Sequence, residues 1–513
     1  MPWIPIVRSL VALTVAGFVA TGSAHASVQA RGSDPPDVDD LRTALRDHHP
    51  DKRRSAVKKL STLGGEDAME LVVSALADPS GKVADEAQLV VVEFESLGVG
   101  DLLLGSDGLR SRDEVVRLRA AEAIGRLSGP VPAERIARSF DRRDPATLRT
   151  ALWSVERLAR REALSGDVFE LVERAEGLLK RRADDRVRAA ALHALAALSR
   201  SSARRALDRV REIRDRETRC SYLMVATDLG DPGLEGILEA AAFDEDPAVR
   251  MKALELMRLQ GFRSTPSVLL ERLRVEPRPA VRGKIVDALR WMTGMRHGDK
   301  LVAWEHTVDH LPHDWDPSQT KNAYSEARRR SGTVAELSRL EPESDRVAIL
   351  VDFSGSLWNE RADGTRRKDL LDPEVIALLE RLVQTGTFFL VPYTGEPHPF
   401  TDRPIDATQR NVRLAQKFFS NASMQGSGNL FDALQLALSF DAIDRVMVLT
   451  DGAPTGGMRW DVDLMVDLVR EQIRFRPVVL DFVLLDAPRG LEKRWQSLAE
   501  STGGRTVALS FQK

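Results

Sequence analysis

The stretch RVAILVDFSGSLW, from Arg346 to Trp358, decides the fold of the second half of this 513-residue chain. Its five consecutive apolar residues, Val347 to Val351, are typical of a strand that is buried on both faces. An acid and two hydroxyl groups follow at once, at Asp352, Ser354 and Ser356. Gly355, between the two serines, eases a tight turn. The sequence therefore predicts a core strand that ends in a small cluster of oxygen atoms.

Strands and helices alternate from this point to the end of the chain. Further strands are expected at 387–393, 445–452, 478–486 and 505–509, and helices at 373–386, 409–419, 429–440, 461–473 and 491–502. Apolar strands that alternate with amphipathic helices predict an α/β domain with a doubly wound, mostly parallel, Rossmann-like sheet. In such sheets, ligands bind beyond the carboxyl ends of the strands.

Two of these strands end in an acid, the first at Asp352 and the strand 445–452 at Asp451. Parallel strands place these acids at the same edge of the sheet. Carboxylate and hydroxyl oxygens suit a hard cation that prefers octahedral coordination, so we expect Mg²⁺ or Mn²⁺ here. The alternative is that the acid and the serines are ordinary turn and helix-capping residues.

These two motifs resemble those of the von Willebrand factor type A (vWA) family, over residues 345–513. The family motif DxSGS stands at Asp352 to Ser356, and its later Asp-Gly stands at Asp451-Gly452. The resemblance implies that Ser354 and Ser356 bind the metal directly and that Asp352 and Asp451 act largely through bound water. It also implies that an Asp or Glu of a protein partner takes the vacant coordination position.

The third motif of the family departs from the usual pattern. Residues 426–434 read GSGNLFDAL, so Gly428 stands where the family has a metal-facing threonine. Ser427 is the candidate substitute if the loop is shifted, and a water molecule is the alternative. The loss of one neutral ligand is expected to weaken cation binding.

Three classes of function remain open. The preferred one is a non-catalytic protein-binding, adhesion or scaffold protein that captures a carboxylate through the metal. The second is a metal-dependent hydrolase, although the sequence has no G-x-S-x-G motif and only His398 as a histidine after residue 345. The third is a structural scaffold whose metal site is degenerate, which Gly428 favours.

The first half of the chain carries a repeat. In the segment 184–198 the apolar residues Val187, Ala191, Ala194 and Leu195 form one face of a helix. Equivalent positions recur at spacings of 30, 33, 32, 39, 31, 31 and 32 residues between about 53 and 281. This pattern predicts an all-α superhelical solenoid at 41–295 and resembles short HEAT repeats. An extended interaction surface is what such an array implies.

Arginine recurs directly after seven of the eight repeat anchors. The positions are Arg54, Arg117, Arg149, Arg188, Arg219, Arg250 and Arg282. We interpret this row as a structural ladder in which each arginine pairs with an Asp or a carbonyl of an adjacent turn. A ligand-binding row is the alternative.

Residues 296–344 are expected to form an aromatic cap over the last repeat, followed by a polar connector. Three of the eight tryptophans fall between Trp291 and Trp315. His306 and His310 have the i, i+4 spacing of two zinc ligands on one helix face, but the glutamate of H-E-x-x-H is replaced by Thr307. Capping or solvated histidines are the preferred interpretation.

The N-terminus predicts export. Residues 1–26 have a basic start, a short apolar core and an A-x-A cleavage site, which together are typical of a signal peptide, and 27–40 is a polar linker. An uncleaved anchor is the alternative, and no other segment is apolar enough to span a membrane. We therefore expect a periplasmic or cell-surface protein of bacterial type.

Composition limits the classes of partner. The formal net charge is −3, from 74 basic and 77 acidic residues, which gives no electrostatic footprint for nucleic acid. Cys220 is the only cysteine, so the domains are expected to be stable without an intrachain disulfide. We expect Cys220 to be a packing residue.

Overall fold

The computed structural model describes residues 37–141, 144–180, 183–316, 329–333, 337, 343–360, 363–384 and 386–511. Val38–Lys513 forms one compact unit, separate from Met1–Asp37. The predicted signal peptide and most of the predicted linker lie outside the described residues. Helix α1 begins at Val38, inside the segment predicted as linker.

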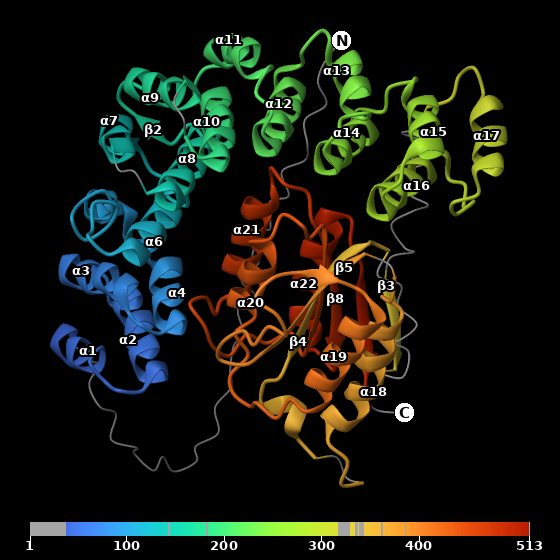
Figure 1. Ribbon diagram of the computed structural model, residues 1–513. Coiled ribbons are helices and arrows are strands. Elements are labelled where there is room, and N and C mark those ends of the chain that lie inside the picture. The colour runs from blue at the N-terminus through green and yellow to red at the C-terminus, as the bar shows by residue number, and fades with distance from the viewer. Residues whose placement is uncertain are drawn as a thin grey trace, which may run out of the picture. The chain divides into compact units, whose positions relative to one another are not determined.

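The second half of the unit is an α/β domain (Figure 1). Its strands are β3 (Arg329–Thr333), β4 (Arg346–Asp352), β5 (Thr387–Tyr393), β6 (Ile405–Asp406), β7 (Arg445–Thr450), β8 (Val479–Leu485) and β9 (Thr506–Ser510). Its helices are α18 (Arg367–Glu380), α19 (Gln409–Ser420), α20 (Leu430–Leu438), α21 (Val462–Ile473) and α22 (Arg489–Thr502). The strand order is β3-β9-β8-β7-β4-β5-β6, and only β6 is antiparallel to its neighbour.

Helices cover both faces of this sheet because side chains alternate along each strand. On β4, Val347, Ile349 and Val351 pack into one core with α18 and α19. Ala348 and Leu350 point the other way, into a core with α20, α21 and α22. All five residues are almost fully buried. The continuous apolar run is thus explained by two cores on either side of one strand.

The edge of the sheet differs from the expectation at one place. Strand β3 pairs in parallel with β9, from Arg329↔Thr506 to Thr333↔Ser510. This strand falls within the segment 296–344 that was predicted to be a cap and connector. The sheet therefore begins before the predicted domain boundary at residue 345. The polar sequence RRSGT lacks the apolar alternation that indicates a strand.

The first half of the unit is a helical region. Its helices are α1 (Val38–Ala44), α2 (Pro50–Leu63), α3 (Glu66–Ser74), α4 (Gly81–Val90), α5 (Val99–Leu103), α6 (Glu114–Ile124), α7 (Ala133–Ala137), α8 (Pro145–Arg160), α9 (Phe169–Lys180), α10 (Asp185–Leu198), α11 (Arg200–Val210), α12 (Arg216–Leu229), α13 (Leu234–Ala241), α14 (Pro247–Gln260), α15 (Thr265–Val275), α16 (Pro279–Thr293) and α17 (Leu301–Asp309). Short strands β1 (Val131–Pro132) and β2 (Leu164–Ser165) pair within it.

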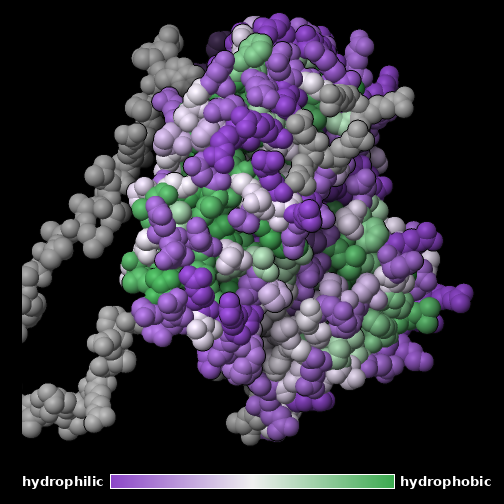
Figure 2. All heavy atoms as spheres, turned by 90° about the vertical axis from the view of Figure 1, so that its left-hand side faces the viewer, coloured by the Kyte–Doolittle hydropathy of each residue, from purple (hydrophilic) through white to green (hydrophobic). Residues whose placement is uncertain are grey.

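The repeat anchors lie inside the core of this helical region. Helix α10 buries Val187, Ala191, Ala194 and Leu195, the face that the sequence pattern predicts. Helices α8, α10, α12, α14 and α16 each pack against the next in this series. On the face shown in Figure 2, hydrophilic side chains cover most of the surface. The packing of these helices in series makes the first half one helical region, and the α/β domain follows it along the chain.

The arginine row mostly forms a ladder of internal ion pairs. The acidic partners are Glu86 for Arg54, Asp144 for Arg117, Asp215 for Arg188, Asp244 for Arg219 and Glu276 for Arg250. Arg282 instead donates to the Leu273 carbonyl, at 2.9 Å. Asp or carbonyl partners confirm the interpretation as a structural ladder at five of the seven positions, at Arg250 through the Asp244 carbonyl at 2.8 Å, whereas the partner of Arg54 is a glutamate. Among the described residues, no such pair is found for Arg149, and burial lowers the pKa of its guanidinium.

Candidate functional site

The site lies where β4 and β7 end side by side. Val351 of β4 is opposite Leu449 of β7, so the next residues of both strands emerge at the same edge of the sheet. Ser356 Oγ donates a hydrogen bond to Asp451 Oδ2 at 2.6 Å, and the hydroxyls of Ser354 and Ser356 are 3.3 Å apart. Two loops that are distant in sequence thus bring three predicted ligands into contact.

Asp352 is held at the back of this cluster. Its side chain is buried, with the residue only 5% exposed. One carboxylate oxygen accepts a hydrogen bond from the Ser354 backbone N–H at 2.9 Å, and the other accepts from Thr450 Oγ1 at 2.9 Å. These two bonds fix the orientation of the carboxylate, because each oxygen has its own donor.

The electrostatics of the cluster favour a cation. Burial, and then the negative charge of Asp451, raise the pKa of Asp352 to about 6. Two carboxylates in a poorly solvated place repel each other, and a divalent cation between them would remove this repulsion. The donor set contains only hydroxyl and carboxylate oxygens, which are the ligands that Mg²⁺ and Mn²⁺ prefer. The residues present therefore fit the expected metal.

The third motif also reaches the site, at Gly428. A Cβ atom built on Gly428 would lie 3.3 Å from both Asp352 carboxylate oxygens and 3.5 Å from the Cβ of Ser354. The Ser427 hydroxyl faces other glycines, since a Cβ on Gly395 would lie 3.3 Å from it. The structure thus places Gly428, rather than the predicted substitute Ser427, against the carboxylate.

Three residues near the cluster were not predicted. Thr450 donates to Asp352, and Thr455 Oγ1 accepts from the Gly428 N–H at 2.6 Å. Tyr393 ends β5 directly opposite Asp352 and is fully buried. Burial, followed by the charge of Asp352, raises the pKa of Tyr393 well above its usual value. Thr450 and Tyr393 share one signal that sequence could have provided, because each is the last residue of a strand adjoining β4.

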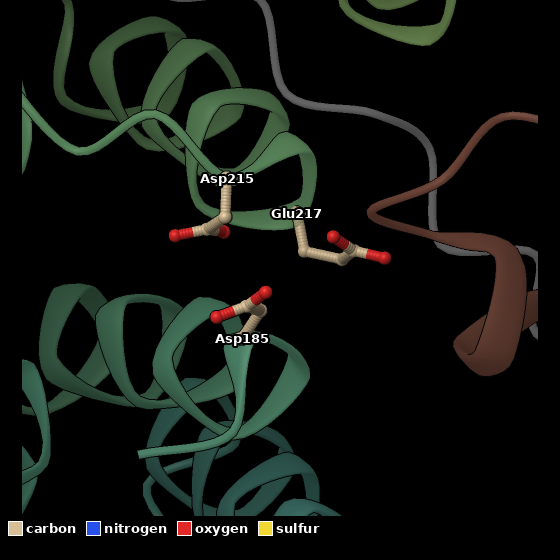
Figure 3. A group of neighbouring side chains, drawn as sticks. All are labelled: Asp185, Asp215 and Glu217. Atoms are coloured by element: carbon tan, nitrogen blue, oxygen red, sulfur yellow. The ribbon is translucent and has the colours of Figure 1, made fainter. Parts of the chain in front are cut away.

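Two other groups of ligand-type side chains lie together among the described residues, one of three acids and one of two histidines. Figure 3 shows Asp185, Asp215 and Glu217 at the starts of α10 and α12. Arg188 Nη1 lies 3.1 Å from Asp185 and 2.6 Å from Asp215, and Arg186 Nε lies 4.0 Å from Glu217, so each of the three carboxylates already has a cationic side chain beside it. It belongs to the arginine ladder.

The predicted histidine pair lies at the end of α17, with His306 inside the helix and His310 as its C-cap, and both residues are exposed. The rings of His306 and His310 stack with centroids 4.2 Å apart, and His310 Nδ1 lies 2.7 Å from the His306 carbonyl oxygen. A hydrogen bond at Nδ1 does not use Nε2, the other ring nitrogen through which a histidine can bind a metal, so the preferred interpretation as solvated or capping histidines stays a prediction. Trp304 of the same helix is fully buried and donates to the Gly298 carbonyl at 2.8 Å.

The chain was compared with known proteins. No family model matches it. It is 26% identical over 183 residues to human von Willebrand factor A domain-containing protein 3A, a match that covers 35% of this chain and 14% of the human protein. The α/β domain is vWA-like.

Two further similarities accompany this one. Mouse inter alpha-trypsin inhibitor, heavy chain 4, is 25% identical over 126 residues, which is 22% of this chain and 13% of the mouse protein. The chain therefore spans a small part of both curated relatives. The solved structure of conserved hypothetical protein BatB from Bacteroides thetaiotaomicron is 15% identical, with a TM-score of 0.24, and covers 32% of this chain and 88% of BatB. Among the described residues, no helix combines the length and apolar character needed to cross a membrane.

Proposed function

We propose that this chain is a non-catalytic binding protein whose vWA-like domain holds Mg²⁺ or Mn²⁺ and captures a carboxylate of a protein partner. Ser354, Ser356, Asp352 and Asp451 would hold the cation. The observation that supports this most strongly is the meeting of Ser356 and Asp451, 95 residues apart, in front of the buried Asp352. A bound dication with one open coordination position attracts an Asp or Glu side chain and fixes its orientation.

The helical region is proposed to be a HEAT-like solenoid that offers an extended interaction surface. Helices α8, α10, α12, α14 and α16 pack in series, and most arginines of the ladder form ion pairs within the helical region. We propose that the whole protein is exported and acts in the periplasm or at the cell surface, on the basis of the N-terminal sequence.

A catalytic role has less support. The hydroxyls of Ser354 and Ser356 contact each other and Asp451, and His398 contacts Thr394. A histidine base is one common way to activate a serine nucleophile, and in the described part of the chain the hydrogen-bond partners of the two serine hydroxyls are each other and Asp451. We therefore keep binding as the proposal, and a metal-dependent hydrolase, in which the cation would activate water, as the alternative.

Calorimetric titration of the full chain with Mn²⁺ and Mg²⁺ tests this proposal. The unaltered protein is expected to bind Mn²⁺. Asp352→Asn is expected to lower the affinity at least tenfold, the usual effect of losing a residue that supports the direct ligands of a metal. Asp402→Asn, an exposed acid in the same domain, is the matched control and is expected to bind normally. If the unaltered chain produces no binding heat at millimolar Mn²⁺ or Mg²⁺, the proposal is wrong and the domain is a scaffold with a degenerate site.

A further inference from the structure

The loop between β7 and α21, residues 451–461, connects the candidate metal site to the helical region. Its Arg459 is 3% exposed and contacts side chains of two helices there. The Arg459 guanidinium donates to Gln88 Oε1 of α4 and to Glu122 Oε1 of α6, both at 2.7 Å. Gln88 in turn donates to Glu122 Oε2 at 2.6 Å. A loop residue of the α/β domain is therefore a member of a closed network inside the helical region.

The backbone of the same loop is held by a second pair of charged residues. Asp85 of α4 is fully buried and accepts hydrogen bonds from the N–H groups of Trp460 at 2.5 Å and Asp461 at 2.8 Å. Arg119 of α6 donates to Asp85 Oδ1 at 2.6 Å and to the Met458 carbonyl at 2.5 Å. The helical region thus satisfies backbone groups of the loop as well as its side chain.

The other end of the loop forms the site. Asp451 is its first residue, and the N–H groups of Thr455 and Gly456 donate to the Gly428 carbonyl at 3.0 and 3.3 Å. Gly428 is the residue that packs against the Asp352 carboxylate. One short loop therefore contacts Asp85 and Glu122 at one end and the cation ligands at the other.

The packing around the loop leaves little space for independent movement of its ends. A Cβ on Gly457 would lie 2.0 Å from Asn429 Oδ1, and a Cβ on Gly81 of α4 would lie 2.5 Å from the Gly457 carbonyl oxygen. The loop is thus enclosed between the third motif and helix α4. Tightly packed groups of this kind move together rather than deforming gradually.

We propose that the helical region controls the cation site through this loop, with Arg459 as the positioning residue. Docking of α4 and α6 holds Asp451 and Gly428 in the form that faces Asp352, and loss of this contact weakens cation binding. The inference rests on the proposed function for its cation, whereas the coupling itself concerns residues of this chain. By linkage, a cation bound at the site also stabilises the docked loop.

The test uses the full chain with Glu122→Gln, which keeps the side-chain shape and removes the negative charge that faces Arg459. Glu114→Gln, an exposed position at the start of the same helix, is the matched control. Two quantities are measured: Mn²⁺ affinity by calorimetry, and amide hydrogen exchange of 426–429 and 451–461 in the metal-free protein. Glu122→Gln is expected to weaken Mn²⁺ binding about tenfold, within the usual range of coupling between sites, and to speed exchange in both segments. The control is expected to change neither.

The outcomes separate the two proposals. If 451–461 exchanges faster in Glu122→Gln while 426–429 and Mn²⁺ affinity are unchanged, the coupling is wrong. If the unaltered chain binds no Mn²⁺, the proposed function fails, and exchange of 426–429 alone decides the coupling. If Glu122→Gln does not fold, Arg459→Lys replaces it, because lysine keeps the charge but lacks the planar fork whose two nitrogens donate to Gln88 and Glu122.

Discussion

Arg250 and Glu276 form a two-pronged ion pair inside the helical region, with Arg250 Nε and Nη2 lying 2.8 and 2.9 Å from the two carboxylate oxygens. The same carboxylate also accepts from Arg272 Nε at 2.8 Å. Glu276 is 3% exposed, so one buried acid compensates two guanidinium groups. This pair is the part of the arginine ladder that is most separated from water.

Glu276→Ala is therefore expected to destabilise the protein by about 3–5 kcal/mol, because it leaves buried positive charge without a partner. The measurement is urea unfolding followed by circular dichroism. Glu305→Ala is the matched control, since Glu305 pairs with Arg274 at the surface, and its cost is expected to be below about 1 kcal/mol. Equal effects of the two substitutions would contradict the structural role of the ladder.

Gly428→Ser is expected to tighten Mn²⁺ binding about fivefold, the effect of one added favourable contact of about 1 kcal/mol. A side chain at this position points at Asp352, so its hydroxyl would supply the neutral oxygen that the glycine lacks. Calorimetry measures the change. Gly428→Ala is the control, because it adds the same Cβ without the oxygen. If serine and alanine weaken binding equally, the close 3.3 Å contact dominates and the prediction fails.

A buried group of charges between α8, α10 and α21 is expected to give a pH dependence of stability. Arg474 donates to both oxygens of Glu156 and to His193 Nδ1. Burial raises the pKa of Glu471 from 4.5 to about 7 and lowers the pKa of His193 from 6.5 to about 4. The two residues act in opposite directions. As the pH rises from about 4.5 to about 7, the folded state binds more protons than the unfolded state at Glu471, so stability is lost; from about 4 to about 6.5 His193 adds stability.

Glu471→Gln is thus expected to gain stability relative to the unaltered protein as the pH rises from 4.5 to 7, by roughly 3 kcal/mol at about 1.4 kcal/mol per pH unit. His193→Gln is expected to lose stability relative to the unaltered protein as the pH rises from 4 to 6.5, because it lacks the stability that His193 adds over this range. Unfolding free energies measured across this range for all three proteins provide the check. Parallel curves for the three proteins would show that neither group titrates as described.

Much of the α/β domain was predictable because its signals are local. The continuous apolar run before Asp352 indicates a strand that is buried on both faces. The alternation of strands and helices indicates that the strands of the sheet are parallel. That arrangement alone brings Asp352 and Asp451 to one edge, and their approach follows from the pairing of β4 with β7. The ladder was predictable for a similar reason, since an arginine repeated in phase meets the same surroundings in each repeat.

The features that sequence did not reveal depend on contacts between distant segments. Arg459 reads as an ordinary loop cation, and its role appears only when α4 and α6 provide Gln88 and Glu122. Strand β3 has no apolar pattern and exists because β9 offers an unpaired edge. The choice between Ser427 and Gly428 depends on which way each residue of the loop faces, and no spacing rule determines that direction.

Cys220 lies in α12 with no exposed surface, its sulfur 3.9 Å from the Ala248 carbonyl oxygen, and burial raises the pKa of its thiol. Alkylating reagents attack the thiolate, so modification must await opening of the surrounding helices. Because the chain has no second sulfhydryl group that could react with the label, the rate of labelling reports how often the helices around Cys220 open.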